Sequence, residues 1–110
     1  VYLDFDFSRA ITIENLLSMK AGMQLDGEEA WRYSDDRLQT LLNREITDKP
    51  GTVFSYDNGI PNILNAIIYN ATNKHADQYA ADRIFKKIGI SNYNWEIDKQ
   101  NGFPDGSGTL

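Results

Sequence analysis

The sequence predicts a mainly α-helical fold with little or no β-sheet. Apolar residues recur at helical spacing in four stretches, residues suited to helix caps stand at the ends of those stretches, and strand-like alternation is almost absent. The length of 110 residues suits one domain. We therefore expect residues 1–110 to form a single helical unit.

The first expected helix follows Thr12, a residue type that caps helix N-termini well. Its apolar stripe consists of Ile13, Leu16 and Leu17. Gly22 is expected to end it in a left-handed conformation. Before it, residues 1–10 alternate as an extended segment does, and Asp4 and Asp6 there could hold a cation or simply form a solvated face.

The second expected helix begins after Ser34, its expected cap, and residues 23–33 before it are expected to form a loop or a short irregular helix. Asp35 and Asp36 then fall in the first turn, where negative charge suits the helix dipole. Tyr33 is expected to pack on Leu38 across the helix start. The buried face is predicted to comprise Leu38, Leu41, Leu42 and Ile46.

The third expected helix starts near Asn58, and Pro61 is tolerable in its first turn. It is the most apolar helix and is placed at the core, with an inner face of Ile63, Leu64, Ile67, Ile68 and Ala71. A fourth helix is expected from about His75 to Ile88, ended by Gly89. Its inner face would be Ala76, Tyr79, Ala80, Ile84, Phe85 and Ile88, and residues 101–109 follow as a loop.

Composition excludes several classes of function. The net charge is −5 without a basic stripe, which argues against nucleic-acid binding. No apolar run approaches the roughly 20 residues that a membrane helix needs. The absence of cysteine excludes disulfides, cysteine catalysis and thiolate metal sites, and the single histidine leaves zinc short of ligands. The spacing within residues 98–108 does not fit a calcium loop. No metal or cofactor is implied.

Three stretches together resemble the serine β-lactamase-like hydrolases, a family that includes class C β-lactamases, D-alanyl-D-alanine carboxypeptidases, related esterases and aminohexanoate-dimer hydrolases. Residues 11–23 resemble the family's ITIxxLLxMxSGM helix, with Ala21 where the family usually has serine. Residues 50–58, PGTVFSYDN, resemble its PGxxFxYxN signature. Residues 83–90 are similar to its xxIFxPLGM stretch, with Lys87 in place of proline, and residues 93–96 resemble the aminohexanoate-dimer branch.

The resemblance implies acyl-serine chemistry, in which a serine and a lysine of an S-x-x-K motif stand beside a Y-x-N motif. Only the latter maps onto this chain, as Tyr56 and Asn58. Tyr56 would shuttle a proton, and Asn58 would hydrogen-bond the lysine or a substrate amide. A phenol has an ordinary pKa near 10, which a neighbouring ammonium would lower. The alternative for Tyr56 is a half-buried core tyrosine.

The other catalytic motifs are absent from this sequence. None of the serines (Ser8, Ser18, Ser34, Ser55, Ser91 and Ser107) has a lysine three positions later, and neither K-[ST]-G nor G-x-S-x-G occurs. We therefore expect the helical subdomain of a larger hydrolase, without the β-sheet domain of the same parent chain. The parent would act on a small-molecule amide or ester, and this chain alone would be inactive. Many relatives are periplasmic or secreted, but the sequence itself indicates no location.

Two aromatic residues are further candidates. Trp31 and Tyr33 occupy the segment that often overhangs the substrate cleft in related hydrolases, so they could form a wall for substrate. Their alternative role is packing at the start of the following helix. His75 is expected to be a surface residue at a helix start.

Two alternatives to the hydrolase of the aminohexanoate-dimer type remain open. Within the enzyme class, the parent could be a penicillin-binding peptidase. Outside it, the chain could be a non-catalytic helical interaction module derived from such an enzyme. The enzyme interpretation requires Tyr56 and Asn58 on an open face beside exposed apolar surface, whereas a buried Tyr56 favours the module.

Overall fold

The fold is built from short helices around one central helix. A computed structural model describes residues 11–110; the expected extended segment at residues 1–10, with Asp4 and Asp6, lies outside this range. The elements are α1 (Ile13–Leu17), η2 (Gly27–Tyr33), α2 (Arg37–Leu42), α3 (Ile60–Thr72), α4 (Ala76–Ala80), η3 (Ala81–Phe85) and η4 (Lys86–Ile88). Within residues 11–110 the β-structure consists of isolated bridges, Met23–Ile46 and Ile97–Pro104. The predicted mainly α-helical class is confirmed.

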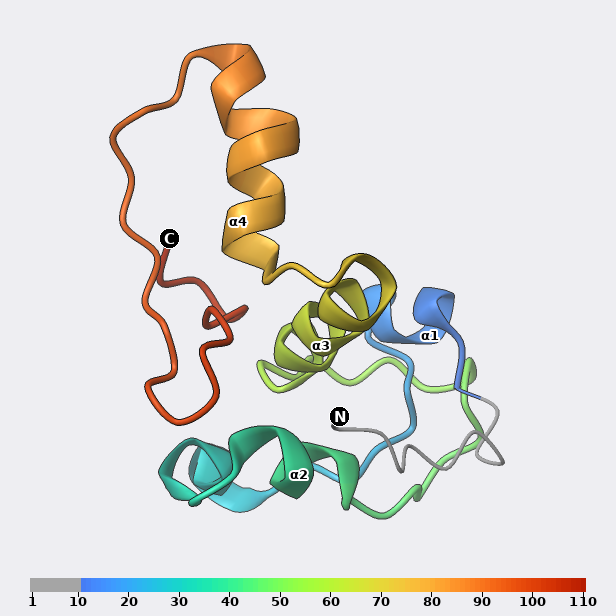
Figure 1. The fold of residues 1–110 in the computed structure, drawn as a ribbon. Coiled ribbons are helices and arrows are strands. Elements are labelled where there is room, and N and C mark those ends of the chain that lie inside the picture. Colours follow the sequence, from blue (N-terminus) through green and yellow to red (C-terminus); the bar gives the residue numbers. More distant parts are fainter. Residues whose placement is uncertain (1–10) are drawn as a thin grey trace.

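The core lies where α3 meets α1 and α2. Figure 1 shows α3 between these two helices, with α4 projecting away and the following chain returning alongside it. The largest fully buried side chains include Trp31 of η2, Leu41 of α2 and Ile63 of α3. Within residues 11–110, no helix is long and apolar enough to cross a membrane.

Helix α1 begins as the sequence predicts and ends earlier. The Thr12 hydroxyl accepts from the amide of Asn15 at 3.1 Å, and the Asn15 side chain accepts from the amide of Thr12 at 3.0 Å. The predicted stripe is only partly correct, because Ile13 and Leu17 are 54% and 66% exposed. Gly22 is left-handed, with φ of 75°, but it does not end the helix, which stops at Leu17.

Helix α2 is capped by Asp36, so the expectation of Ser34 as the cap was wrong. The Asp36 carboxylate accepts from the amide of Gln39 at 3.0 Å. Ser34 instead donates its hydroxyl to the carbonyl oxygen of Trp31 at 2.8 Å. Tyr33 is 86% exposed, which contradicts its expected packing on Leu38. The predicted burial of Leu38 and Leu41 is confirmed.

Helix α3 occupies the centre, as predicted, but the fourth helical stretch is less buried than expected. Leu64 and Ile67 of α3 pack against the core, although Ala71 is exposed. The run from α4 through η4 ends at left-handed Gly89, as predicted. Its residues Ile84 and Ile88 are 51% and 64% exposed, because this part projects away from α3 (Figure 1).

Candidate active site

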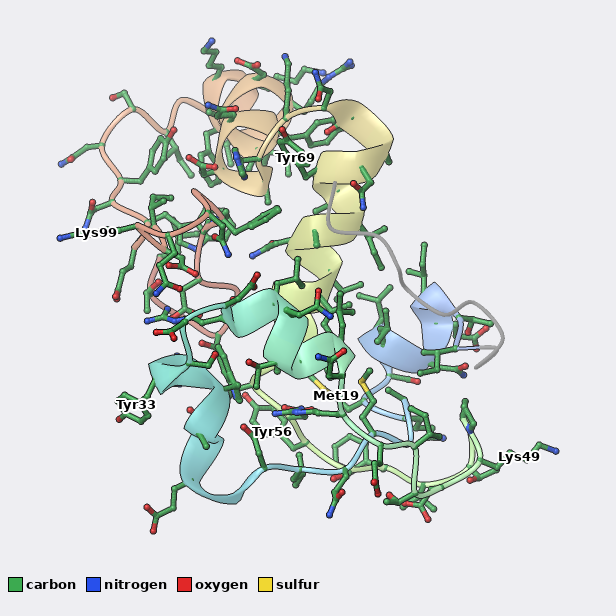
Figure 2. All side chains as sticks on the ribbon, turned by 60° about the horizontal axis from the view of Figure 1, so that its bottom comes forward. Met19, Tyr33, Lys49, Tyr56, Tyr69 and Lys99 are labelled. Atoms are coloured by element: carbon green, nitrogen blue, oxygen red, sulfur yellow. The ribbon has the colours of Figure 1, made fainter. Side chains whose placement is uncertain are left out.

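The Y-x-N segment is an irregular stretch that leads into α3. Its path is fixed at one end where the amide of Ser55 donates to the carbonyl oxygen of Met19 at 2.9 Å. Beyond it, side chains alternate between solvent and interior: Tyr56 is 65% exposed, Asp57 is 6% exposed and Asn58 is partly buried. Figure 2 shows Tyr56 in the same part of the molecule as Met19. The middle residue is therefore internal, and the two motif residues flank it.

Asp57 anchors this segment through a buried ion pair. Its carboxylate accepts from Nη1 of Arg44 at 2.5 Å and from the amide of Gly59 at 2.8 Å. Arg44 also pairs with Asp26, whose other oxygen accepts from the amide of Trp31 at 2.7 Å. Because a buried charge requires such partners, these contacts fix the Y-x-N turn against the end of α2 and the start of η2.

Asn58 is held by contacts on its side chain and on its backbone. Its Nδ2 donates to Oε1 of Glu29, which belongs to η2. Its carbonyl oxygen accepts from Nδ2 of Asn62, one turn along in α3, at 3.0 Å. The Asn62 side chain also accepts from the amide of Gly106 at 3.1 Å. The carboxamide of Asn58 thus has a defined position.

Arg32 connects Glu29 to the C-terminal loop. Its Nε donates to the second carboxylate oxygen of Glu29, its Nη1 lies 3.2 Å from Asp105 and its Nη2 lies 2.8 Å from the hydroxyl oxygen of Ser107. Hydrogen bonds from Arg32 and Asn58 hold the pKa of Glu29 below its usual value. Burial opposes the charge of Asp105, but hydrogen bonds from Ser107 and the nearby Arg32 outweigh it and lower the pKa of Asp105.

The Tyr56 side chain is exposed, and its hydroxyl makes no hydrogen bond within residues 11–110. A free hydroxyl at an anchored position can give or take a proton from a group placed beside it. The structure brings the Y-x-N segment next to Glu29 and Arg32, two residues that the sequence interpretation did not select. Neither lies in a recognisable motif, and Arg32 and Asp105 are 73 positions apart in the chain, so no local pattern could have indicated them.

The two aromatic candidates of η2 lie in opposite environments. Trp31 is 1% exposed and belongs to the core cluster, so its predicted place in a substrate wall is corrected: a buried indole offers no surface to a ligand. Tyr33 projects into solvent (Figure 2). It borders a groove of about 320 Å³ together with Arg32, Arg37 and the loop at residues 96–100.

His75 is not the surface residue that the sequence predicts. Its ring is partly buried between aromatic neighbours, 4.6 Å from the ring centre of Tyr69 and 4.8 Å from that of Phe103. It stands at the N-cap position of α4 without a capping hydrogen bond. Within residues 11–110, no three acidic or histidine side chains are grouped as a metal site would require.

Comparison with known proteins places this chain in a family. Residues 2–109, nearly the whole chain, match the family described as Beta-lactamase. The chain belongs to this family. One relative is Protein flp of Staphylococcus aureus (strain MW2), which is 31% identical over an alignment of 87 residues; the match covers 74% of this chain and 18% of that protein. The chain therefore spans about a fifth of the length of this relative. Membership of the family supports a hydrolase-related origin for the chain.

Proposed function

We propose that this chain contributes the Y-x-N part of the active site of a serine hydrolase that cleaves amide or ester bonds through an acyl-serine intermediate. The observation that carries the proposal is the contrast in exposure within the motif. Tyr56 is 65% exposed on a segment that the buried Asp57 anchors. A proton shuttle requires such a combination, because its hydroxyl must be accessible while its backbone stays in place.

Tyr56 carries the proton in this proposal. When the serine oxygen bonds to the substrate carbonyl carbon, its proton passes to the phenolate oxygen of Tyr56, and the phenol so formed gives that proton to the leaving nitrogen or oxygen as the bond from that atom to the carbonyl carbon breaks. The ordinary pKa of a phenol, near 10, makes this transfer unfavourable at neutral pH unless a cation lies close by. The sequence has no S-x-x-K, so the serine and the lysine would come from a segment outside residues 1–110.

Tyr33 is proposed to contact the substrate. Its side chain borders the groove of about 320 Å³, and Arg32 lines the same groove while bonding to Glu29. Hydrogen bonds through Arg32 and Glu29 therefore link the wall of the groove to Asn58. An aromatic ring at 86% exposure loses unfavourable contact with water when a ligand covers it.

A β-sheet domain of the same parent chain is the proposed partner. Exposed apolar side chains lie on α1 and on the approach to Tyr56: Ile13, Leu17, Val53 and Phe54. The bond from Ser55 to Met19 connects these two stretches. Apolar surface beside a catalytic motif supports a docked domain there. The interpretation as a non-catalytic module predicts a buried Tyr56, so the exposure of this residue supports the interpretation as part of an enzyme.

The test uses the complete product of the gene that encodes this segment, assayed with a chromogenic β-lactam and a p-nitrophenyl ester. We expect Tyr56→Phe to lower kcat by about 10²–10⁴-fold, the usual contribution of a proton-transfer residue. Tyr79→Phe is the matched control, since Tyr79 lies on α4 beside Arg83, and it should leave kcat unchanged. The 110-residue chain alone should show no turnover above a heat-treated sample.

Two results would contradict the proposal. An inactive complete product that also fails to form a covalent adduct with a fluorescent penicillin would favour the non-catalytic module. Full activity in Tyr56→Phe would remove the proton-shuttle role from this residue.

A further inference from the structure

We propose that Glu29 is a positioning residue that sets the orientation of the Asn58 carboxamide and so directs Oδ1 of Asn58 towards a hydrogen-bond donor in the active site. This inference rests on the proposed function for its catalytic meaning, although the orientation itself can be tested without catalysis. Glu29 lies outside the Y-x-N motif and comes from a different element, η2.

The chemistry of the contact fixes which end of the carboxamide faces Glu29. An ionised carboxylate only accepts hydrogen bonds, so the NH₂ group of Asn58 must point to it and the carbonyl oxygen must point elsewhere. The contact joins Nδ2 of Asn58 to Oε1 of Glu29. A protonated or amidated side chain at position 29 could accept or donate, and the orientation of Asn58 would no longer be determined.

The carboxylate of Glu29 is itself held in place from the opposite side. Arg32 donates to the second oxygen of Glu29 and also donates hydrogen bonds to Asp105 and Ser107. These contacts leave Oε1 for Asn58. The charged groups that face Glu29 are therefore Arg32 and, at longer range, Asp105, whose negative charge opposes ionisation of Glu29.

The backbone that carries Glu29 adopts an unfavourable conformation. Glu28 and Glu29 have φ of 54° and 56°, in the left-handed region that residues with a Cβ atom rarely occupy. Two such residues in succession persist only where surrounding contacts determine them, and strain of this kind is often found at functional sites. Here it places the Glu29 carboxylate between Arg32 and Asn58.

Oδ1 of Asn58, oriented in this way, can accept a hydrogen bond from an ammonium group or from an amide N–H. Two sources fit this chemistry: the ammonium group of a lysine from outside this chain, and the N–H of an amide substrate. The two differ in their consequences, because an ester has no N–H. Loss of the orientation would slow amides and esters alike in the first case and amides selectively in the second.

The first experiment is NMR of the 110-residue chain at neutral pH, with the Asn58 side-chain amide assigned by its absence in Asn58→Ala. We expect the two Hδ2 protons to differ in solvent exchange, since only one is bonded to Glu29. Glu29→Gln should remove this protection. Glu28→Gln is the matched control: it makes the same charge change at a neighbour with similar φ that makes no hydrogen bond to Asn58.

A pH titration gives a second reading of the same contact. The ¹⁵Nδ2 resonance of Asn58 should follow the ionisation of Glu29, with a midpoint below the ordinary value of 4.5, and this titration should vanish in Glu29→Gln and survive in Glu28→Gln. Equal loss of the protection or of the titration in both variants would overturn the proposal, because the effect would then be one of charge or fold. Unprotected Hδ2 protons in the wild-type chain would overturn it as well.

The second experiment measures kcat and KM of the complete gene product with a matched amide and ester. Glu29→Gln should lower kcat more than it raises KM, and Glu29→Asp should recover part of the loss. Unchanged kinetics in Glu29→Gln would overturn the catalytic meaning of the contact. The NMR result stands on the chain alone, so failure of the proposed enzyme function and failure of the positioning role give different outcomes.

Discussion

Asp57 illustrates how one buried side chain determines what its neighbours can do. Its position between Tyr56 and Asn58 makes it the variable residue of the motif, but its carboxylate is bonded to Arg44 and to the amide of Gly59. Removing one partner of a buried ion pair leaves the other charge without compensation. The anchor is therefore a stability element as well as part of the site.

We expect Asp57→Ala to lower the free energy of unfolding by about 3 kcal/mol, near the lower end for a broken buried pair. The expected loss of stability is not larger because Arg44 still forms an ion pair with Asp26 in this variant. Urea denaturation followed by circular dichroism measures the loss. Asp48→Ala is the control, since Asp48 is exposed and its side chain makes no hydrogen bond or ion pair within residues 11–110; an equal loss there would contradict the anchor.

At the residue scale the sequence indicated the motif but not its surroundings. Tyr56 and Asn58 could be selected because the motif is local. Glu29 and Arg32 could not, because their partners lie far along the chain and only the folded structure brings them together. Trp31 was misjudged since an aromatic side chain in an irregular segment packs inward or outward according to neighbours that the sequence does not specify.

At the level of elements, the close approach of α2 to the start of α3 depends on Gly59, which has no side chain. A Cβ atom on Gly59 would lie 2.4 Å from Cδ2 of Leu41 and 3.0 Å from Oδ1 of Asp57. The φ of Gly59 is −71°, which any residue adopts, so the constraint comes from space rather than from backbone conformation.

We therefore expect Gly59→Ala to destabilise the protein by about 1–3 kcal/mol, as overpacking does. Gly27→Ala is the matched control because its Cβ atom would meet nothing within 4 Å, and it should stay within about 0.5 kcal/mol of the wild type. Thermal unfolding of both variants measures the difference. A Gly59→Ala variant as stable as Gly27→Ala would mean that Leu41 moves aside at no cost.

The four α-helices within residues 11–110 were predictable in order, whereas their lengths and buried faces were less so. Thr12 and Gly89 gave correct ends because capping is a local property. Helix α1 is only five residues long, and Ile13 and Leu17 stay exposed, because periodicity indicates which residues could be buried but not whether another element covers them. The same applies to Ile84 and Ile88.

For the whole molecule, the acidic groups of the network make stability depend on pH. The pKa of Asp105 is lower in the folded chain than its ordinary value. A group of this kind stabilises the fold above its unfolded pKa of about 3.9, and the contribution is lost as pH falls through the folded value. Glu29 acts in the same direction.

We expect the free energy of unfolding to fall as the pH is lowered from about 5 towards 3, because the unfolded chain takes up protons there before the folded chain does. Asp105→Asn should destabilise the protein at pH 7 by about 2 kcal/mol, the value of a hydrogen bond to a charged group, and should flatten the acid dependence. Urea titrations at several pH values test both effects. An undiminished acid slope in the variant would assign the dependence to other carboxylates.

The connection from Arg32 to Asp105 has a consequence for synthesis at the ribosome. The residues on either side of this contact are 73 positions apart, and translation delivers Glu29 and Asn58 long before Asp105. A nascent chain can form α3 and close the turn at Asp57 as soon as those parts emerge. The guanidinium that holds Glu29 gains Asp105 and Ser107 as partners only when residues 105–107 leave the exit tunnel, so the contacts around Glu29 are completed after the Y-x-N turn.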